Sequence, residues 1–466
     1  MKRILALTVL YVFWTTQVVA AAPVAITAND QKDVMVTIYN GNLGLVKDSR
    51  ESRFDAGMIE VKFMDVAAQI DPTSVHLKSL TDPPGLKIVE QNYEYDLLTS
   101  EKLMEKYVGK TVRLYQGNAT YQEATLLSTN GPVWEINGQI HMGSFGNVVL
   151  PALPENLVSK PTLVWLLSNA RPALQRIEAS YLTGGITWKA DYVMVINAAD
   201  TRSDLTGWVT IDNKSGGSYK NAAVKLVAGD INRAPLRDTR KAMVALSAPA
   251  AAEASREFKS EGFFEYHLYT LDGRTTIKDK QTKQLALLAA TDVPVDKRFI
   301  YYGAAEYFRT QYGAPMSTQK VGIYLELKNS KDHRLGMPLP KGKVRVYKAD
   351  ASGSQQLIGE DSIDHTPKDE RVKLKIGDAF DVVGERVQKD WKKIASSLYE
   401  IEWEISLRNH KKEDVTVEVI EPVPGDWEVL RATLPHEKVD AFTLRFRVPV
   451  KKDGETKLVY RVRVRF

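Results

Sequence analysis

Apolar and polar residues alternate along most of this chain, a pattern typical of strands with one buried face. Clear examples are VMVTIYNG (34–41), IEVKFMDV (59–66) and YEIEWEISLRN (399–409). Valine, isoleucine, tyrosine and tryptophan, which favour strands, fill many of the apolar positions. The pattern therefore predicts a mainly β protein with many short strands.

One short stretch predicts a helix. In SEKLMEKYVG (100–109), Ser100 suits the N-cap, the apolar residues share one face, and Gly109 suits the end. The stretch 381–396 has some helical character, but its β-branched pairs and Gly384 favour an irregular strand.

Dipeptides that favour tight turns separate the strand patterns. Asn137-Gly138 lies within VWEINGQIHM (133–142), which predicts two short strands joined by a type I′ turn. A glycine pair lies within SYLTGGITWKADYV (180–193), and the same reasoning predicts a hairpin there.

The second strand of that predicted hairpin carries aromatic residues with two interpretations. Trp188 and Tyr192 are four residues apart and share one face of a strand. Most such pairs belong to a hydrophobic core. The alternative is an aromatic platform that stacks on a sugar or a peptide, to which Trp208 would contribute. These three residues are the candidate ligand-binding residues.

Three segments share an order of strand, asparagine, polar residues and second strand. They are 208–227, 323–347 and 403–420, and the asparagines are Asn213, Asn329 and Asn409. Asparagine suits a strand end because it bonds nearby backbone and tolerates left-handed geometry. We interpret these segments as hairpins of Ig-like sandwich modules.

Composition places the domain boundaries. The stretch 151–161 has three prolines and suits a linker, and 245–262 is rich in Ala, Ser and Glu without a strand pattern, which predicts a low-complexity insertion.

The expected fold is mainly β, with several Ig-like β-sandwich modules, a small SH3-like barrel and one short helix. The expected segments are a signal peptide (1–20), an N-terminal β domain (21–105), a small barrel-like unit (106–150), a central β domain (151–320) and a C-terminal Ig-like sandwich (321–466).

Two strand patterns near the C-terminus carry opposite charges on one face. The acidic pattern contains Glu400, Glu402 and Glu404, and the basic pattern contains Arg461, Arg463 and Arg465. Neighbouring strands of this kind gain cross-strand pairs worth about 0.2–1 kcal/mol each. We therefore expect the two strands to be adjacent, although each row alone would also suit a solvated face.

The N-terminus has the pattern of a secretory signal peptide. Lys2 and Arg3 precede an apolar stretch (4–19), and the small residues that follow predict cleavage between Ala20 and Ala21. The alternative is a retained membrane anchor. No later stretch is long and apolar enough for a spanning helix. The chain has no cysteine, so an exported form has neither disulfides nor a lipidated cysteine. A periplasmic or secreted protein is expected.

Sequence motifs for catalysis, metals and cofactors do not occur. The seven histidines are scattered without metal-ligand spacing, and neither a GxSxG elbow nor a phosphate-binding glycine loop is found. We therefore predict no catalytic, metal-binding or cofactor-binding residues. The formal net charge of +5, with both signs interspersed, does not indicate a nucleic-acid partner.

Carboxylate pairs leave one enzymatic alternative open, because a glycosidase needs only two carboxylates about 5–10 Å apart, anywhere in the sequence. Five aspartates lie at expected strand ends or turns: Asp191, Asp212, Asp230, Asp364 and Asp381. Aspartate at such positions also caps turns, which is the structural interpretation of each.

Several separated segments resemble bacterial exported proteins that carry domain of unknown function 4139. In chain order they are 38–48, 184–193, 207–230, 264–271, 335–350 and 403–429. The same domain occurs in proteins named mucoidy inhibitor A, in which a coiled coil precedes it, whereas this chain is β-rich over 30–150 and has no heptads. The resemblance implies a β-sandwich architecture and export, and it brings no catalytic residues.

Three functions are compatible with these patterns. The leading one is a non-catalytic cell-envelope protein that binds a protein or a polysaccharide, with exposed sheet edges available for strand addition. The second is a periplasmic, glycosidase-like hydrolase with carboxylates assembled by the fold. The third is an outer-membrane β-barrel, suggested by the alternating C-terminus that ends at Phe466, although the strands are short for that class.

Overall fold

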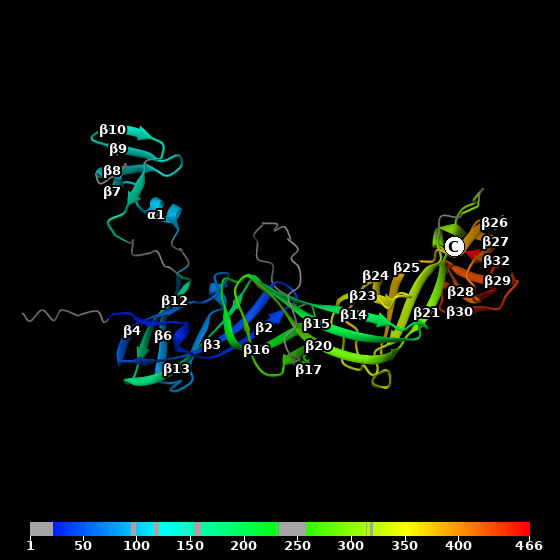
Figure 1. Cartoon of the computed structure of the whole chain (residues 1–466), viewed down its shortest axis with the longest axis horizontal. Coiled ribbons are helices and arrows are strands. Elements are labelled where there is room, and N and C mark those ends of the chain that lie inside the picture. The colour runs from blue at the N-terminus through cyan, green and yellow to red at the C-terminus, as the bar shows by residue number, and fades with distance from the viewer. Residues whose placement is uncertain are drawn as a thin grey trace, which may run out of the picture.

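The computed structural model describes residues 22–94, 99–115, 121–144, 146–152, 160–229, 231–232, 258–313, 315–316 and 320–466. The expected signal peptide and its cleavage residues, Ala20 and Ala21, lie outside the described residues, as do 245–257 of the expected insertion. The protein is mainly β, as the alternation predicts. Figure 1 shows an elongated row of sandwich units, with one small unit beside the N-terminal end of the row.

Two sheets form the first sandwich. The N-terminal sheet consists, in spatial order, of β1 (Val24–Ile26), β4 (Gly57–Met64), β12 (Thr162–Asn169) and β6 (Leu86–Glu94). The long sheet consists of β17 (Phe258–Phe263), β18 (Tyr266–Leu271), β16 (Tyr219–Ala228), β2 (Gln31–Tyr39), β3 (Leu43–Phe54), β13 (Ala173–Thr183) and β5 (His76–Ser79), with β19 (Thr275–Ile277) on β16. The segment 245–262 was expected to lack strand structure, but its last residues, from Phe258 onward, belong to strand β17.

A buried arginine ties these two sheets together. Arg50 on β3 is 1% exposed, and it forms an ion pair of 2.7 Å with Asp48. Its guanidinium also donates to the carbonyl oxygens of Ile26 and Met64, which belong to the facing sheet. It lies 3.7 Å from the ring centroid of Phe63. A charge this deep requires such complete pairing, because an unpaired one would be strongly destabilising.

The small unit is an open sheet with one helix, α1 (Ser100–Lys106). Its strands are, in spatial order, β10 (Gln139–Met142), β9 (Val133–Ile136), β8 (Tyr121–Ser128), β7 (Thr111–Tyr115) and β11 (Asn147–Val149). The predicted helix and the hairpin at Asn137-Gly138 are confirmed, but Thr99 caps the helix instead of Ser100. The expected small SH3-like barrel is not formed, because β10 and β11 are the two ends of the sheet and do not pair among the described residues.

A bridging sheet links this sandwich to the next. It consists of β20 (Gln281–Pro294), β15 (Arg202–Asn213), β14 (Ile186–Ile196), β23 (Gly342–Ala349) and β24 (Gln355–Ile363). Its buried face contributes to one continuous core that runs from Ile26 of the N-terminal sheet to Leu374 of β25 (Arg371–Asp378). Strand β20 contacts β17 of the long sheet and also β22 (Gly322–Lys328) of the next sandwich.

The C-terminal sandwich has its own core. Its six-stranded sheet consists of β25 (Arg371–Asp378), β22 (Gly322–Lys328), β21 (Asp296–Tyr302), β28 (Val415–Pro422), β31 (Thr443–Val450) and β30 (His436–Lys438). Its C-terminal sheet consists of β26 (Val382–Ala395), β27 (Leu398–Asn409), β32 (Gly454–Arg465) and β29 (Asp426–Ala432). Single 3₁₀ turns are η1 (Ala28–Asp30), η2 (Pro72–Ser74), η3 (Ala305–Phe308) and η4 (Lys331–His333). The predicted irregular strand at 381–396 is confirmed as β26, which has two register shifts.

The predicted hairpin in SYLTGGITWKADYV is wrong. Strand β13 belongs to the long sheet and β14 to the bridging sheet, so the chain crosses between sheets at Gly184-Gly185. Gly185 has a φ of +73°, and its N–H donates to Asn42. A Cβ at Gly185 would lie 2.7 Å from the carbonyl oxygen of Lys214. The glycines permit this crossing through the same backbone freedom that favours hairpin turns.

The three asparagine segments are also crossings between sheets and not hairpins. Asn213, Asn329 and Asn409 each lie at a strand end, as expected, but the next strand belongs to a different sheet. All three are 0% exposed. Each side-chain amide donates to backbone carbonyls of the crossing, for example from Asn213 to Gly217 and Lys278, both at 2.9 Å. A buried side-chain amide thus replaces the missing strand partners of these turns.

Asn169, which the sequence analysis missed, has the same position at the end of β12. It is 2% exposed, and its amide donates to the carbonyls of Asp55 (2.8 Å) and Arg171 (2.7 Å) before the chain enters β13 of the facing sheet. A crossing between sheets that is bonded by a buried asparagine, called an asparagine corner here, therefore occurs four times among the described residues.

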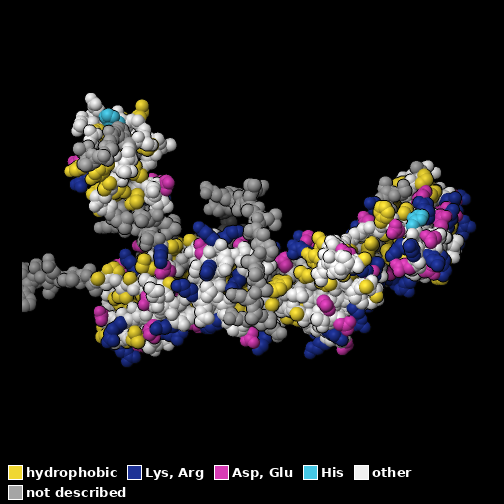
Figure 2. Space-filling model, in the orientation of Figure 1, with side chains coloured by type: hydrophobic (Ala, Val, Ile, Leu, Met, Phe, Trp, Pro, Cys, Tyr) yellow, Lys and Arg dark blue, Asp and Glu magenta, His cyan; other side chains and the backbone are white. Residues whose placement is uncertain are grey.

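Figure 2 shows basic and acidic side chains interspersed on the visible side of the C-terminal sandwich. The expected adjacency of the acidic and basic strands is confirmed, because Glu400 pairs in register with Arg463 and Glu402 with Arg461. On the six-stranded sheet, one charged residue per strand forms a continuous chain of ion pairs. In strand order it is Arg371, Glu326, Arg298, Glu418, Arg445 and Glu437.

Candidate functional site

A loop between η4 and β23, residues 334–341, separates two hollows and is called the wall loop here. Three buried side chains donate hydrogen bonds to its carbonyls: Asn329 to Met337 (2.9 Å), Tyr269 to Pro338 (3.0 Å) and Tyr192 to Pro340 (2.8 Å). The donors come from β18, β14 and the end of β22, so three elements fix one loop. The wall loop is consequently a well-supported part of the fold.

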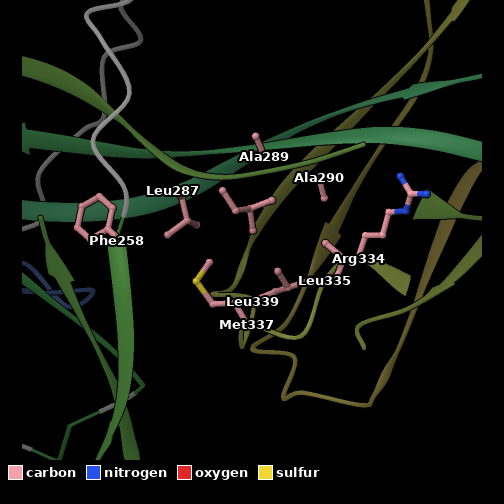
Figure 3. A pocket seen from close by; sticks show the side chains of 9 residues that line it. Phe258, Leu287, Ala289, Ala290, Arg334, Leu335, Met337 and Leu339 are labelled. Carbon is pink, nitrogen blue, oxygen red and sulfur yellow. The ribbon is translucent and has the colours of Figure 1, made fainter. Parts of the chain in front are cut away.

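The first hollow is an apolar groove of about 220 Å³ between β20, the wall loop and the start of β17. Figure 3 shows the side chains of β20 facing those of the wall loop, with Phe258 at one end and Arg334 at the other. Its main apolar lining is Phe258, Leu287, Leu288, Leu335, Met337 and Leu339.

Strand β20 is the end strand of the bridging sheet at this groove. In the part of the chain that the structure describes, it pairs with β15 and with no other strand. Ala289 is exposed beside the groove, and Leu288 is half-buried. Arg334 forms an ion pair of 3.0 Å with Asp292 near the end of the strand. An unpaired strand edge beside an apolar groove is a surface to which an extended peptide can add.

The second hollow is a polar cleft of about 490 Å³ on the other side of the wall loop. The residues that give it chemical character are Asn40, Asp191, Lys341, Lys343 and His365. They come from the turn after β2, from β14, from the start of β23 and from the segment after β24.

Hydrogen bonds orient the polar groups of the cleft. The amide of Asn40 donates to the carbonyl of Trp188 (3.2 Å), and the backbone N–H of Lys341 donates to Nδ1 of His365 (3.1 Å). The carboxylate of Asp191 accepts from the hydroxyl of Thr210 (2.8 Å). These bonds hold the side chain of Asn40 and the carboxylate of Asp191 at the cleft, and they place the ring of His365 beside Lys341.

The structure does not bring the three candidate ligand-binding residues together. Trp188 and Tyr192 are 2% and 1% exposed. The indole of Trp188 donates to the carbonyl of Val227, and Tyr192 holds the wall loop. Trp208 is half-buried and lies in register with Asp191. These two residues share the face of the bridging sheet that is opposite to the face of Trp188 and Tyr192. The core interpretation therefore describes Trp188 and Tyr192, and Trp208 alone is open to a ligand.

The carboxylates of the glycosidase alternative are not assembled in either hollow. Asp191 is the carboxylate that lines the polar cleft, and the described lining of the apolar groove has none. Asp212 pairs instead with Lys214 at 2.6 Å, and Asp230 lies outside the described residues. Among the described residues, no three His, Asp or Glu side chains lie close enough to hold a metal ion. None of the described helices has the length and apolar character needed to cross a membrane.

Asn40, Lys341 and His365 were missed as site residues by sequence reasoning. They lie in different segments with no shared motif, so only the fold brings them to one cleft. The available signals are the stretches 38–48 and 335–350, which contain Asn40 and Lys341 and resemble parts of bacterial exported proteins.

Comparison with models of protein families finds no match for this chain, and comparison with curated proteins finds none either. The resemblance to exported proteins with domain of unknown function 4139 stays a prediction.

Proposed function

We propose that this protein is an exported, non-catalytic binding protein of the cell envelope, whose protein partner adds an extended segment to β20. The observation that carries the proposal is the edge of β20, which has no neighbouring strand in the described part of the chain and lies beside an apolar groove. Export is supported by the charged and apolar pattern of residues 2–21.

Strand addition explains both features of this surface. The backbone of the partner would hydrogen-bond along β20, and alternate side chains would enter the groove between Leu288 and Met337. The groove, at about 220 Å³, is smaller than the sites of small-molecule ligands, which are about 300–1,000 Å³. It therefore suits single apolar side chains of a longer segment.

A peptide selection tests this proposal. Extended peptides would be selected on phage against residues 21–466, and their affinities measured for the wild type and for Ala289→Lys, which places a charge beside the groove. We expect at least about a tenfold loss of affinity in this variant. Thr282→Lys, an exposed substitution at the far end of β20, is the matched control. A second probe is the same peptide with alternate backbone nitrogens methylated, which removes strand hydrogen bonds and keeps the side chains. Equal binding of the methylated peptide would show that the partner does not add as a strand.

A further inference from the structure

A row of four side chains crosses the outer face of the bridging sheet beside the polar cleft. Asp191 lies in register with Trp208 on one neighbouring strand and with Lys343 on the other. Lys343 in turn lies in register with Ser362 of β24. Residues in register on neighbouring strands point to the same face. An aromatic ring, a carboxylate, an ammonium and a hydroxyl are thus aligned across four strands.

The cleft also contains a buried hydrogen-bond acceptor without a donor. The side-chain oxygen of Asn40 is buried and accepts no hydrogen bond from the described residues, although its amide nitrogen is bonded to Trp188. Leaving such a group unpaired costs about 1–3 kcal/mol. A ligand hydroxyl in the cleft would satisfy this oxygen, and the carboxylate of Asp191 is a second acceptor in the same cleft.

Positive charge exceeds negative charge in the cleft lining. Lys189, Lys341 and Lys343 line it, with Asp191 as the one acidic residue among the lining positions. Lys343 pairs with Glu360 at 2.6 Å, whereas Lys341 has no ion-pair partner among the described residues. The Lys343 pair is exposed and therefore weak. A ligand that carries an anionic group would be attracted to Lys341.

We propose that the polar cleft binds an anionic sugar, a hydroxyl-rich ring that carries a carboxylate or a phosphate. The ring hydroxyls donate to Asn40 and Asp191. The anionic group is bound by Lys341, and the apolar side of the ring packs on the open part of Trp208. The volume of about 490 Å³ lies within the range of about 300–1,000 Å³ for small-ligand sites. The residues of this site differ from those at the edge of β20, so the sugar-binding proposal and the strand-addition proposal can each fail independently of the other.

Calorimetric titration of residues 21–466 with three probes tests this inference. Trigalacturonate carries carboxylates, glucose 6-phosphate carries a phosphate, and maltotriose is the neutral control. We expect at least one anionic probe to bind, more weakly as salt rises, and at least about tenfold more tightly than maltotriose, the effect of one charge-assisted hydrogen bond. The stronger anionic probe identifies the source of the charge.

Two variants locate the binding. Lys341→Gln should weaken the anionic probe about tenfold, and Trp208→Ala should weaken it as well. Lys412→Gln, an exposed substitution in the C-terminal sandwich, should have no effect. Thermal melting of each variant shows whether it is folded. Absence of binding by both anionic probes, equal binding of maltotriose, or unchanged affinity in a folded Lys341→Gln variant overturns the proposal.

Discussion

The hydroxyl of Tyr192 donates a 2.8 Å hydrogen bond to the carbonyl oxygen of Pro340, 148 residues away in sequence. Desolvation by burial raises the pKa of this tyrosine well above its usual value, so the hydroxyl keeps its proton and remains a donor. A residue that the sequence suggested as a ligand contact thus supports the loop between the two hollows.

Tyr192→Phe is predicted to destabilise the protein and to loosen the wall loop. The carbonyl of Pro340 is buried, so loss of its donor should lower the free energy of unfolding by about 1–3 kcal/mol. Amide hydrogen exchange at Leu335, Met337 and Leu339 should become faster. Tyr121→Phe, at a 47% exposed position, is the control. Unchanged exchange in the wall loop would show that this bond does not hold it.

Alanine at the buried asparagine corners is predicted to be strongly destabilising. Asn409 donates to the carbonyls of Glu413, Val450 and Lys451, and Asn409→Ala removes this donor from all three, of which the bond to Val450 is buried. We expect a loss of at least about 2 kcal/mol in the free energy of unfolding, measured with denaturant. The exposed Asn92 on β6 provides the control substitution to alanine, with an effect within about 0.5 kcal/mol. Similar effects at both positions would contradict a structural role for Asn409.

Removing one partner of the ion pair inside the C-terminal sandwich is predicted to lower the free energy of unfolding more than replacing both partners by apolar residues. Arg386 and Glu421 are both 0% exposed and bonded at 2.6 and 2.9 Å, and Arg386 lies between Tyr301 and Trp403. Arg386→Met leaves a buried carboxylate unpaired and should cost about 3–5 kcal/mol. The double variant Arg386→Met with Glu421→Leu should recover much of that loss. A double variant as unstable as Arg386→Met would show that packing, and not charge, dominates at this position.

The stability of the C-terminal sandwich is predicted to fall in acid. The hydrogen bond from Arg445 lowers the pKa of Glu437, and that from Arg461 lowers the pKa of Asp390. A carboxyl whose pKa is lower in the folded state stabilises the fold above its unfolded pKa, about 4. That contribution is lost as pH falls through the folded value. The melting temperature should therefore decrease as the pH falls below about 5, more steeply at low salt.

Arg445→Met should flatten this pH dependence, because Glu437 loses its partner. Lys412→Gln, which removes a charge away from the ion-pair chain, is the control. A slope in Arg445→Met equal to that of the wild type would mean that other carboxyls determine the acid sensitivity.

The mature protein is predicted to begin at Ala21. Osmotic shock of the native cell should release a species whose intact mass corresponds to residues 21–466. A full-length mass in the membrane fraction would indicate a retained anchor in its place.

Local patterns predicted strands and their ends better than they predicted partners. Alternation located most strands, and the charges of Glu402 and Arg461 predicted the pairing of β27 with β32 correctly, because cross-strand ion pairs depend on register. The crossings at Gly185 and Asn213 were assigned to hairpins, because a tight turn within one sheet and a crossing to another use the same residue types. Only long-range pairing distinguishes them.

The two hollows could not be derived from sequence for a similar reason. The polar cleft combines Asn40, Asp191 and His365, which are far apart along the chain, and none of them belongs to a recognisable motif. The apolar groove depends on which strand ends the bridging sheet, and this is decided by the whole sheet order. Trp208 was suggested for its aromatic ring, but its neighbours became known only from the register of β14 and β15.

The wall loop contributes lining residues to both hollows. Met337 faces the groove and Lys341 faces the cleft, within a few residues of one chain segment. An occupant of either hollow that shifts this segment changes the affinity of the other hollow, and thermodynamic reciprocity requires the same factor in both directions. The hydrogen bonds from Asn329, Tyr269 and Tyr192 oppose such a shift, at about 1 kcal/mol for each bond lost. Their combined strength would therefore limit any coupling between the two hollows.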